Sequence, residues 1–309
     1  MLKRPMDVLS QFPIRKTPKQ KTRFREAVRA YGESLGYTVT EERYSLGVCN
    51  LILGDPETAR YLVTAHYDTC AAMWLPNFIT PCNVFLYLVY RLARSALLIA
   101  GPAVVGAAAG LMLGNGAVKW ACITAYLILL LFRIFGPANK NNANDNTSGV
   151  ATLLEIARTL PKNQRQKVCF VLFDLEEAGL IGSGFYRKKH KVATDRQLVL
   201  NLDCVGDGDC LRMFPTKNLR KDRRKLTSLY RACGYFGKKS LLVYEKNAFV
   251  YPSDQRHFPY GIGICSLQNR KKTLYISRIH TNQDTILDET NVNILRAALT
   301  TFICCDEVN

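Results

Sequence analysis

The chain has 309 residues, of which 48% are hydrophobic and 22% charged, so it can form one sizeable domain or one domain with an insertion. Its formal net charge of +17 favours anionic partners such as phospholipid headgroups or acidic peptides. The basic clusters lack the interleaved aromatic residues of a single-strand binder and match no nucleic-acid-binding module. We therefore expect no nucleic-acid partner.

The eleven cysteines are scattered without C-x-x-C spacing. This is the pattern of neither a disulfide framework nor a cysteine-type zinc site, and it suits a reducing compartment. The segment Met1–Pro13 has no long apolar stretch, so no cleaved signal peptide is expected there.

The first third of the chain predicts a helix followed by strands. Apolar residues recur every three or four positions over Lys19–Leu35, which indicates an amphipathic helix after Pro18. Short β-prone runs follow at Tyr37–Val39, Cys49–Leu53 and Tyr61–Ala65.

A long apolar segment, residues 70–136, then interrupts the pattern. Ala96–Val118 contains no charged residue and is long enough to span a bilayer, which needs roughly 20 residues. Lys119–Phe135 is shorter, and its terminal basic residues could reach the interfaces. A turn signal, Gly114-Asn115-Gly116, lies near their junction. We expect an inserted transmembrane helical hairpin; the alternatives are a buried lid and an oligomer interface.

The remainder alternates helices with strands. Nearly continuous apolar runs at Lys167–Phe173 and Leu198–Leu202 are typical of central strands covered on both faces. Predicted helices lie at Thr147–Leu160, Lys221–Tyr235 and Thr290–Cys305. The alternation predicts a layered α/β fold with a largely parallel sheet. We place the catalytic domain at 1–69 and 137–309, and the inserted segment at 70–136.

Acidic and histidine side chains follow the predicted strands. His66 and Asp68 come directly after one strand, Glu176 and Glu177 after another, and Asp203 after a third. Ligands gather at the carboxyl ends of strands in open α/β sheets, so these groups should converge. Taken singly, each is more often structural: a lone Asp before a helix usually caps it, and adjacent glutamates usually face water. In combination with Asp145 and His280 they form an inventory suited to zinc.

The ordered motifs resemble the co-catalytic di-zinc aminopeptidases, metallopeptidase family twenty-eight, in a membrane-anchored, bacterial-type form. The segments that carry the resemblance are Ala65–Thr69, Asn144–Ala151, Phe173–Ser183, Asn201–Asp203, Ser253–Gln255 and Ile279–Thr281. The resemblance implies a three-layer zinc-exopeptidase fold with a central, mostly parallel mixed sheet. It also implies two Zn²⁺ ions and peptide substrates with a free N-terminus.

By the same resemblance, the metal ligands would be His66 and Asp203 for one zinc, Glu177 and His280 for the other, and Asp145 between them. Asp68 would orient His66. Glu176 would be the general base for a metal-activated water. Tyr251 is a candidate for stabilising the oxyanion of the substrate.

Two features depart from the family pattern. The connection from Asp68 to Asp145 is far longer than usual, and the apolar segment fills it. Gln255 stands where a histidine is common. The alternatives are a glutaminyl-cyclase-like zinc acyltransferase, which uses one zinc, and a non-catalytic membrane scaffold of the same fold. The complete ligand set favours the peptidase. Membrane lipid is the expected partner of the hairpin, and basic residues near its ends favour a cytoplasmic catalytic domain.

Overall fold

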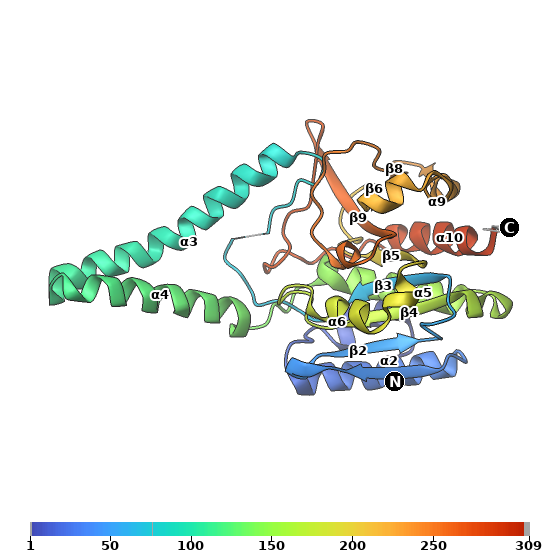
Figure 1. Ribbon diagram of the computed structural model, residues 1–309, viewed down its shortest axis with the longest axis horizontal. Helices are drawn as coiled ribbons and strands as arrows, with labels where there is room; N and C mark the ends of the chain where they lie inside the picture. Colours follow the sequence, from blue (N-terminus) through green and yellow to red (C-terminus); the bar gives the residue numbers. More distant parts are fainter. Residues whose placement is uncertain (1, 76, 306–309) are drawn as a thin grey trace.

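A ten-stranded mixed sheet forms the middle of the molecule, whose computed structural model describes residues 2–75 and 77–305 (Figure 1). The strand order is β1-β2-β4-β3-β5-β9-β6-β8-β7, and β10 pairs with β9. The strands are β1 (Val39–Arg43), β2 (Cys49–Leu53), β3 (Tyr61–His66), β4 (Val168–Phe173), β5 (Leu198–Leu202), β6 (Cys210–Pro215), β7 (Gly234–Phe236), β8 (Lys239–Val243), β9 (Gly261–Arg270) and β10 (Thr273–Tyr275).

The four central strands of this sheet, β4, β3, β5 and β9, run parallel to one another. Antiparallel pairs flank them, with β2 beside β4 and β6 beside β9. The carboxyl ends of the central strands therefore meet at one edge of the sheet, which is where ligands bind in folds of this kind. The predicted α/β fold with a centrally parallel mixed sheet is confirmed.

Helices cover both faces of the sheet. Along β3 the residues Tyr61, Val63 and Ala65 pack on one face, into a core shared with α2, α5 and α10, while Leu62 packs on the other, in a core shared with α6. The period of two in a strand places alternate side chains on opposite faces, so a strand buried on both must be apolar throughout. The longer helices are α2 (Pro18–Ser34), α5 (Gly149–Thr159), α6 (Ile181–Lys189) and α10 (Glu289–Cys305).

The shorter helical segments lie in the connections. They are η1 (Pro5–Asp7), α1 (Val8–Gln11), η2 (Ser45–Gly47), η3 (Ala143–Ser148), η4 (Lys162–Lys167), α7 (Lys191–Thr194), α8 (Lys217–Lys221), α9 (Arg223–Leu229), η5 (Tyr230–Ala232) and η6 (Asp254–His257).

One predicted helix is wrong. The segment Lys221–Tyr235 divides into the end of α8, α9, η5 and the first residues of β7. Asp222 separates the two helices, because its side chain caps α9 by accepting a hydrogen bond from the Lys225 backbone N–H at 3.0 Å. Gly234 then begins a strand that pairs with Leu241 of β8. A local cap and pairing with the next strand outweighed the helical periodicity.

The inserted segment forms two long helices, α3 (Val84–Leu113) and α4 (Gly116–Phe135), which pack on each other and project together from the catalytic domain (Figure 1). The helix of the first predicted span thus begins at Val84 rather than near Ala96. Asn83 caps it by accepting from the Leu86 backbone N–H, and Tyr87 packs into a core cluster of the catalytic domain. At about 45 Å and 30 Å, both helices reach the thickness of a bilayer's hydrocarbon core.

A buried ion pair fixes α2 to the catalytic end of β4. Lys21 Nζ lies 2.5 Å from Asp174 Oδ1, and the two side chains are 9% and 1% exposed. Asp174 also accepts from the Cys49 backbone N–H at 3.2 Å. The carboxyl group therefore joins α2, β2 and β4 just before the glutamate pair.

We expect Lys21→Ala to lower the free energy of unfolding by about 3 kcal/mol, because it leaves a buried carboxylate without its counter-ion. Urea denaturation measures this effect. Lys19→Ala, on the exposed side of the same helix, is the matched control and should stay within about 0.5 kcal/mol of the parent. Equal midpoints for the two variants would contradict this account of the ion pair.

Candidate active site and metal centre

The candidate site lies where the central strands end. His66 is the last residue of β3 and pairs with Phe173, the last residue of β4. Glu176 and Glu177 follow β4 by a few residues, and Asp203 directly follows β5. The structure thus brings together the groups that the sequence placed after separate strands.

Asp145 occupies the centre of the site. Its Oδ1 lies 3.2 Å from His66 Nε2, and its Oδ2 lies 3.0 Å from His280 Nε2. The carboxylate thus presents one oxygen to each histidine. Asp145 sits in η3, and Gly149 then begins α5, where an added Cβ would lie 2.4 Å from the Leu202 carbonyl oxygen. Only glycine allows this close approach of α5 to β5.

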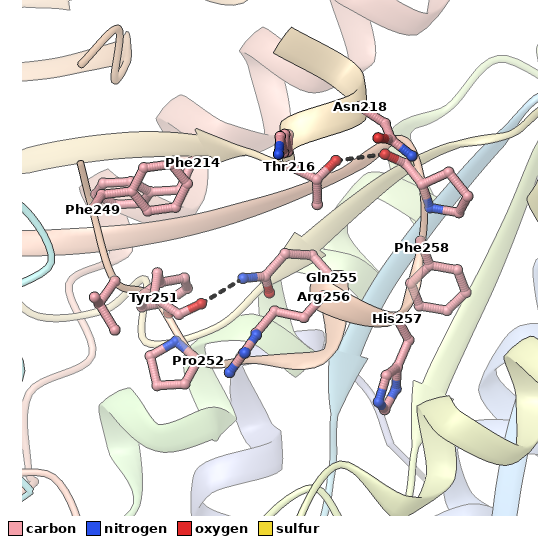
Figure 2. Close-up of a pocket in the computed structure, with 13 residues that line it drawn as sticks. Phe214, Thr216, Asn218, Phe249, Tyr251, Pro252, Gln255, Arg256, His257 and Phe258 are labelled. Atoms are coloured by element: carbon pink, nitrogen blue, oxygen red, sulfur yellow. Dashed lines mark hydrogen bonds between the residues drawn. The ribbon is translucent and has the colours of Figure 1, made fainter. Parts of the chain in front are cut away.

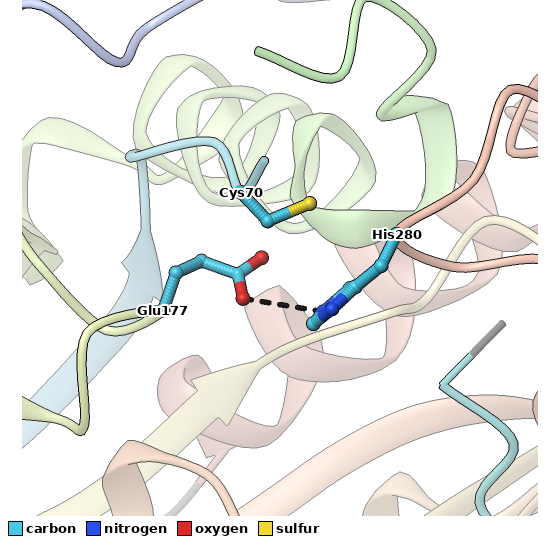
Figure 3. A group of neighbouring side chains, drawn as sticks. All are labelled: Cys70, Glu177 and His280. Carbon is cyan, nitrogen blue, oxygen red and sulfur yellow. Dashed lines mark ion pairs between the residues drawn. The ribbon is translucent and has the colours of Figure 1, made fainter. Parts of the chain in front are cut away.

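Two groups of possible metal ligands surround Asp145. His66, Asp145 and Asp203 form the first group, and Cys70, Glu177 and His280 form the second, with the ligand atoms of each group within 4.8 Å of one another. Figure 3 shows the second group. His66 Nε2 is 3.7 Å from Asp203 Oδ1 in the first group, and His280 Nε2 is 3.2 Å from Glu177 Oε2 in the second. The five predicted ligands therefore converge, and their role as ligands stays a prediction.

Several buried polar atoms of these groups have no hydrogen-bond partner among residues 2–75 and 77–305. They are both ring nitrogens of His66, Asp203 Oδ1 and Glu177 Oε1. Buried polar atoms are rarely left unsatisfied, and nitrogen and carboxylate oxygen are ligands that zinc accepts. The residues fit a divalent metal centre.

The pKa values of the site reflect an excess of buried negative charge. Burial alone would lower the pKa of His66, but Glu176, Asp145 and Asp203 raise it well above its ordinary value. Likewise partial burial would lower the pKa of His280, but Glu177 and Asp145 raise it to about 9. Burial, together with neighbouring carboxylates, raises the pKa of Glu177 to about 7 and that of Glu176 well above its ordinary value. Bound cations would relieve this repulsion.

Asp68 links the first motif to the glutamate pair. Its two carboxylate oxygens accept hydrogen bonds from the backbone N–H groups of Glu176, at 3.0 Å, and Glu177, at 3.3 Å. Oδ1 is also 3.5 Å from His66 Nδ1, the side on which an orienting group belongs. Asp68 is thus adjacent to both the histidine and the glutamates.

Asp284 was not found from the sequence. Its carboxylate oxygens accept from the backbone N–H groups of Asn144, at 2.7 Å, and Asp145, at 3.0 Å, so it fixes the loop that presents Asp145. Burial, with repulsion from Asp145, raises its pKa to about 7. Its only sequence signal is its position shortly after His280.

Arg15 was also missed. It is a fully buried arginine whose guanidinium donates to the Tyr67 carbonyl, Asn142 Oδ1 and Thr147 Oγ1. It therefore joins the first motif to the Asp145 segment. In the sequence it is one of several basic residues between Arg15 and Arg25, and nothing there distinguishes it from the others.

Tyr251 and Gln255 border a cavity of about 570 Å³ beside the site (Figure 2). The Tyr251 hydroxyl donates to the Asp203 backbone carbonyl at 2.8 Å, so the phenol contacts the chain of a candidate ligand. Gln255 donates to the Tyr251 carbonyl and accepts from Asn201, and it belongs to neither ligand group. The predicted oxyanion role of Tyr251 stays a prediction.

The model of peptidase family M28 matches residues 132–302, more than half of the chain. The chain belongs to this family. Membership of a peptidase family indicates a hydrolase, in agreement with the motif resemblance. No curated protein matches the chain.

Solved structures share the fold. Glutaminyl cyclase from Porphyromonas gingivalis is 16% identical, with coverage of 97% of this chain and 96% of that one and a TM-score of 0.63. A leucine aminopeptidase precursor from Bacteroides thetaiotaomicron is 17% identical, with coverage of 98% and 95% and a TM-score of 0.61. A putative Zn-dependent exopeptidase from Bacteroides vulgatus is 16% identical, with coverage of 98% and 94% and a TM-score of 0.54. At these identities the likeness concerns the fold alone.

We expect the metal-free protein to lose stability as the pH rises from about 6.5 to about 9. The folded-state pKa of His280 is raised from 6.5 to about 9, so the folded state holds this proton more tightly than the unfolded state. The associated stabilisation is complete below the lower value and is lost as the pH passes the higher one. Melting temperatures of chelator-treated protein across this range measure the slope.

The matched variant for this measurement is His280→Gln, which removes the titrating group and should flatten the slope. Added zinc should also flatten it, because bound ions replace the protons. A pH-independent melting temperature for the metal-free parent would contradict the charge arrangement described above.

Proposed function

We propose that the chain is a zinc-dependent aminopeptidase that removes N-terminal residues from peptides and uses two zinc ions. The observation that carries this proposal is the position of Asp145, whose two carboxylate oxygens each lie beside a different histidine. A carboxylate shared in this way suits two adjacent ions, and each histidine has a further acidic partner, Asp203 or Glu177.

In this proposal His66 and Asp203 hold one ion, Glu177 and His280 hold the other, and Asp145 contacts both. The ions would supply Lewis-acid polarisation of the substrate carbonyl and activation of water. Asp68 holds His66 and the glutamate pair in a fixed relative position, because it contacts both.

Glu176 is the proposed general base. Its Oε2 lies 4.0 Å from His66 Nε2, beside the first ligand group but outside both groups. Burial and the neighbouring Glu177 raise its pKa, which brings a carboxylate toward the range where it can accept a proton and return it near neutral pH. We infer that Glu176 takes the proton of the attacking water and returns it to the leaving amine.

The charge of the site favours a substrate with a free amino terminus. Asp254 is buried, and burial with repulsion from Asp203 and Asp68 raises its pKa to about 7. A positively charged terminal ammonium group would be attracted to this acidic region, whereas a blocked terminus would not. This supports exopeptidase over endopeptidase action.

A glutaminyl-cyclase-like zinc acyltransferase is the second candidate, because a glutaminyl cyclase shares the fold over nearly the whole chain. It would need one zinc ion, while this chain assembles two groups of possible ligands. That difference favours the peptidase. The same two groups speak against a non-catalytic scaffold, which would have no need to retain them.

We expect zinc-loaded protein to hydrolyse peptides with a free N-terminus and to leave N-acetylated peptides intact. Glu176→Gln should lower kcat roughly 10²–10⁴-fold while the zinc content is unchanged, because it removes a base and no ligand. Asp145→Ala should lose metal. Peptide assays and elemental analysis measure these effects, and Glu33→Gln, an exposed glutamate, is the control.

Three results would reject the proposal: cleavage of blocked peptides only, full turnover by Glu176→Gln, or full turnover without metal. Conversion of N-terminal glutamine to pyroglutamate without hydrolysis would select the cyclase instead.

We further propose that α3 and α4 anchor the catalytic domain in a membrane. Both pass the test for a membrane-spanning helix by length and composition, and almost none of their apolar windows is buried in the structure. A core helix of a soluble protein would be mostly buried, and a signal sequence would lie near the N-terminus. Exposed apolar side chains run along both helices, and they include Leu97, Ile99, Val104, Leu111, Trp120, Ile128, Leu131 and Phe135.

The basic residues of the hairpin favour a cytoplasmic catalytic domain. Arg91, Arg94 and Arg133 lie toward the ends of the helices next to the catalytic domain, and Arg94 donates to Asn77, near the start of the insertion, at 3.0 Å. The tip carries only Lys119. Basic residues beside membrane spans are retained on the cytoplasmic side. The partners would therefore be membrane lipid and peptides inside the cell.

We expect the full chain to sediment with membranes and to need detergent for extraction. Replacement of Ala96–Phe135 by a flexible Gly-Ser linker should release it into the soluble fraction, because it removes most of the exposed apolar surface. A cysteine introduced at Asn115 should react with an impermeant maleimide in intact cells.

A chain that is soluble without detergent would reject the anchor. External protease that digests the catalytic domain, combined with a protected Asn115→Cys, would reverse the proposed orientation.

A further inference from the structure

Cys70 occupies a position at the metal centre that no family motif explains. It lies two residues after Asp68, at the start of the inserted segment, and its side chain is buried at 7% exposure. Its Sγ lies within 4.8 Å of the possible ligand atoms of Glu177 and His280 (Figure 3). The spacing of the cysteines in the sequence matched no cysteine-type zinc site and gave no sign of this position.

We propose that the Cys70 thiolate is a ligand of the ion held by Asp145, Glu177 and His280. This inference rests on the proposed two-ion function. Thiolate sulfur, imidazole nitrogen and carboxylate oxygen are the three protein ligand types that zinc prefers.

The backbone around Cys70 holds the side chain in place. The Cys70 carbonyl accepts from the Asn139 N–H at 3.0 Å, and Ala71 forms a bridge with Ala138. The Met73 N–H donates to the His280 carbonyl at 2.7 Å. The two ends of the insertion and the His280 segment therefore form one connected unit, so Cys70 and His280 keep a fixed relation.

The backbone of His280 is itself constrained. Its φ is 64°, in the left-handed region that residues other than glycine rarely adopt. Such conformations persist where the surroundings enforce them, and the Met73 hydrogen bond is one such contact. The strain is consistent with a backbone that holds the His280 side chain in position to bind an ion.

A fourth protein ligand would make the two ions different. Asp145, Glu177, His280 and Cys70 would complete a tetrahedral shell at the second ion. His66, Asp145 and Asp203 would leave one position open at the first. Structural zinc sites have four protein ligands, and catalytic sites keep a free position. The free position would then lie on the side of His66, where Glu176 lies 4.0 Å away.

Cobalt substitution tests the inference directly. A thiolate bound to Co²⁺ gives a sulfur-to-metal charge-transfer band in the near ultraviolet, which imidazole and carboxylate ligands do not give. We expect this band in the cobalt-loaded full chain and its loss in Cys70→Ser. We also expect chelator competition to show that Cys70→Ser binds its more tightly held ion at least 10–100-fold more weakly than the parent protein does.

Cys169→Ser is the matched control, because Cys169 is also buried but lies in an apolar cluster and belongs to neither group of possible ligands. It should retain the band. If Cys70→Ser does not fold, X-ray absorption of the zinc-loaded parent decides, since a sulfur ligand scatters at about 2.3 Å and nitrogen or oxygen at about 2.0–2.2 Å.

Absence of the band, its persistence in Cys70→Ser, or a zinc shell without sulfur would each overturn the inference. These outcomes are distinct from failure of the proposed function. A protein that binds two ions and cleaves peptides without a sulfur ligand refutes only the role of Cys70. If the protein binds metal but cleaves no peptide, and Cys70→Ser still loses the band, the result supports Cys70 as a metal ligand and refutes the proposed peptidase function.

Discussion

The negative charge buried around Asp145 is the constraint on which the rest of the structure depends. Asp145, Glu177 and Asp203 lie within a few ångströms of two histidines at the carboxyl edge of the central strands. Such a concentration is costly in a protein interior unless cations or hydrogen-bond donors compensate it. The chain supplies donors at the periphery, where backbone N–H groups satisfy Asp68 and Asp284, and leaves the central atoms unsatisfied. A metal centre is the arrangement that this distribution suits.

The insertion enters and leaves the fold beside this centre. Its first residues include Cys70, its ends are bridged at Ala71 and Ala138, and Met73 is bonded to His280. A segment that anchors the protein in lipid would thus share its base with the segment that carries His280. If the hairpin moved relative to the catalytic domain, Cys70 and His280 would be displaced first, because these contacts link them to the base of the hairpin.

Elements whose local residue pattern sets them were predicted from the sequence, whereas elements set by caps, packing or strand pairing were not. Strands buried on both faces, such as β4 and β5, were recognised because burial requires a continuous apolar run. The start of α3 was misplaced, since Asn83 and the packing of Tyr87 set it rather than hydrophobicity. The strands from β6 to β10 were not predicted; β6 pairs with β9, far along the chain, and β7 and β10 have only three residues each, too few for a clear local pattern.

The sequence by itself determined the fold class, the inserted apolar segment and the types of side chain available to the site, because these depend on periodicity, composition and motif order. Only the tertiary structure decided which oxygen of Asp145 faces which histidine, and that Cys70, Asp284 and Arg15 belong to the same centre. These relations join residues far apart in the chain, and their distances follow from how the strands and loops pack. No local pattern contains that information.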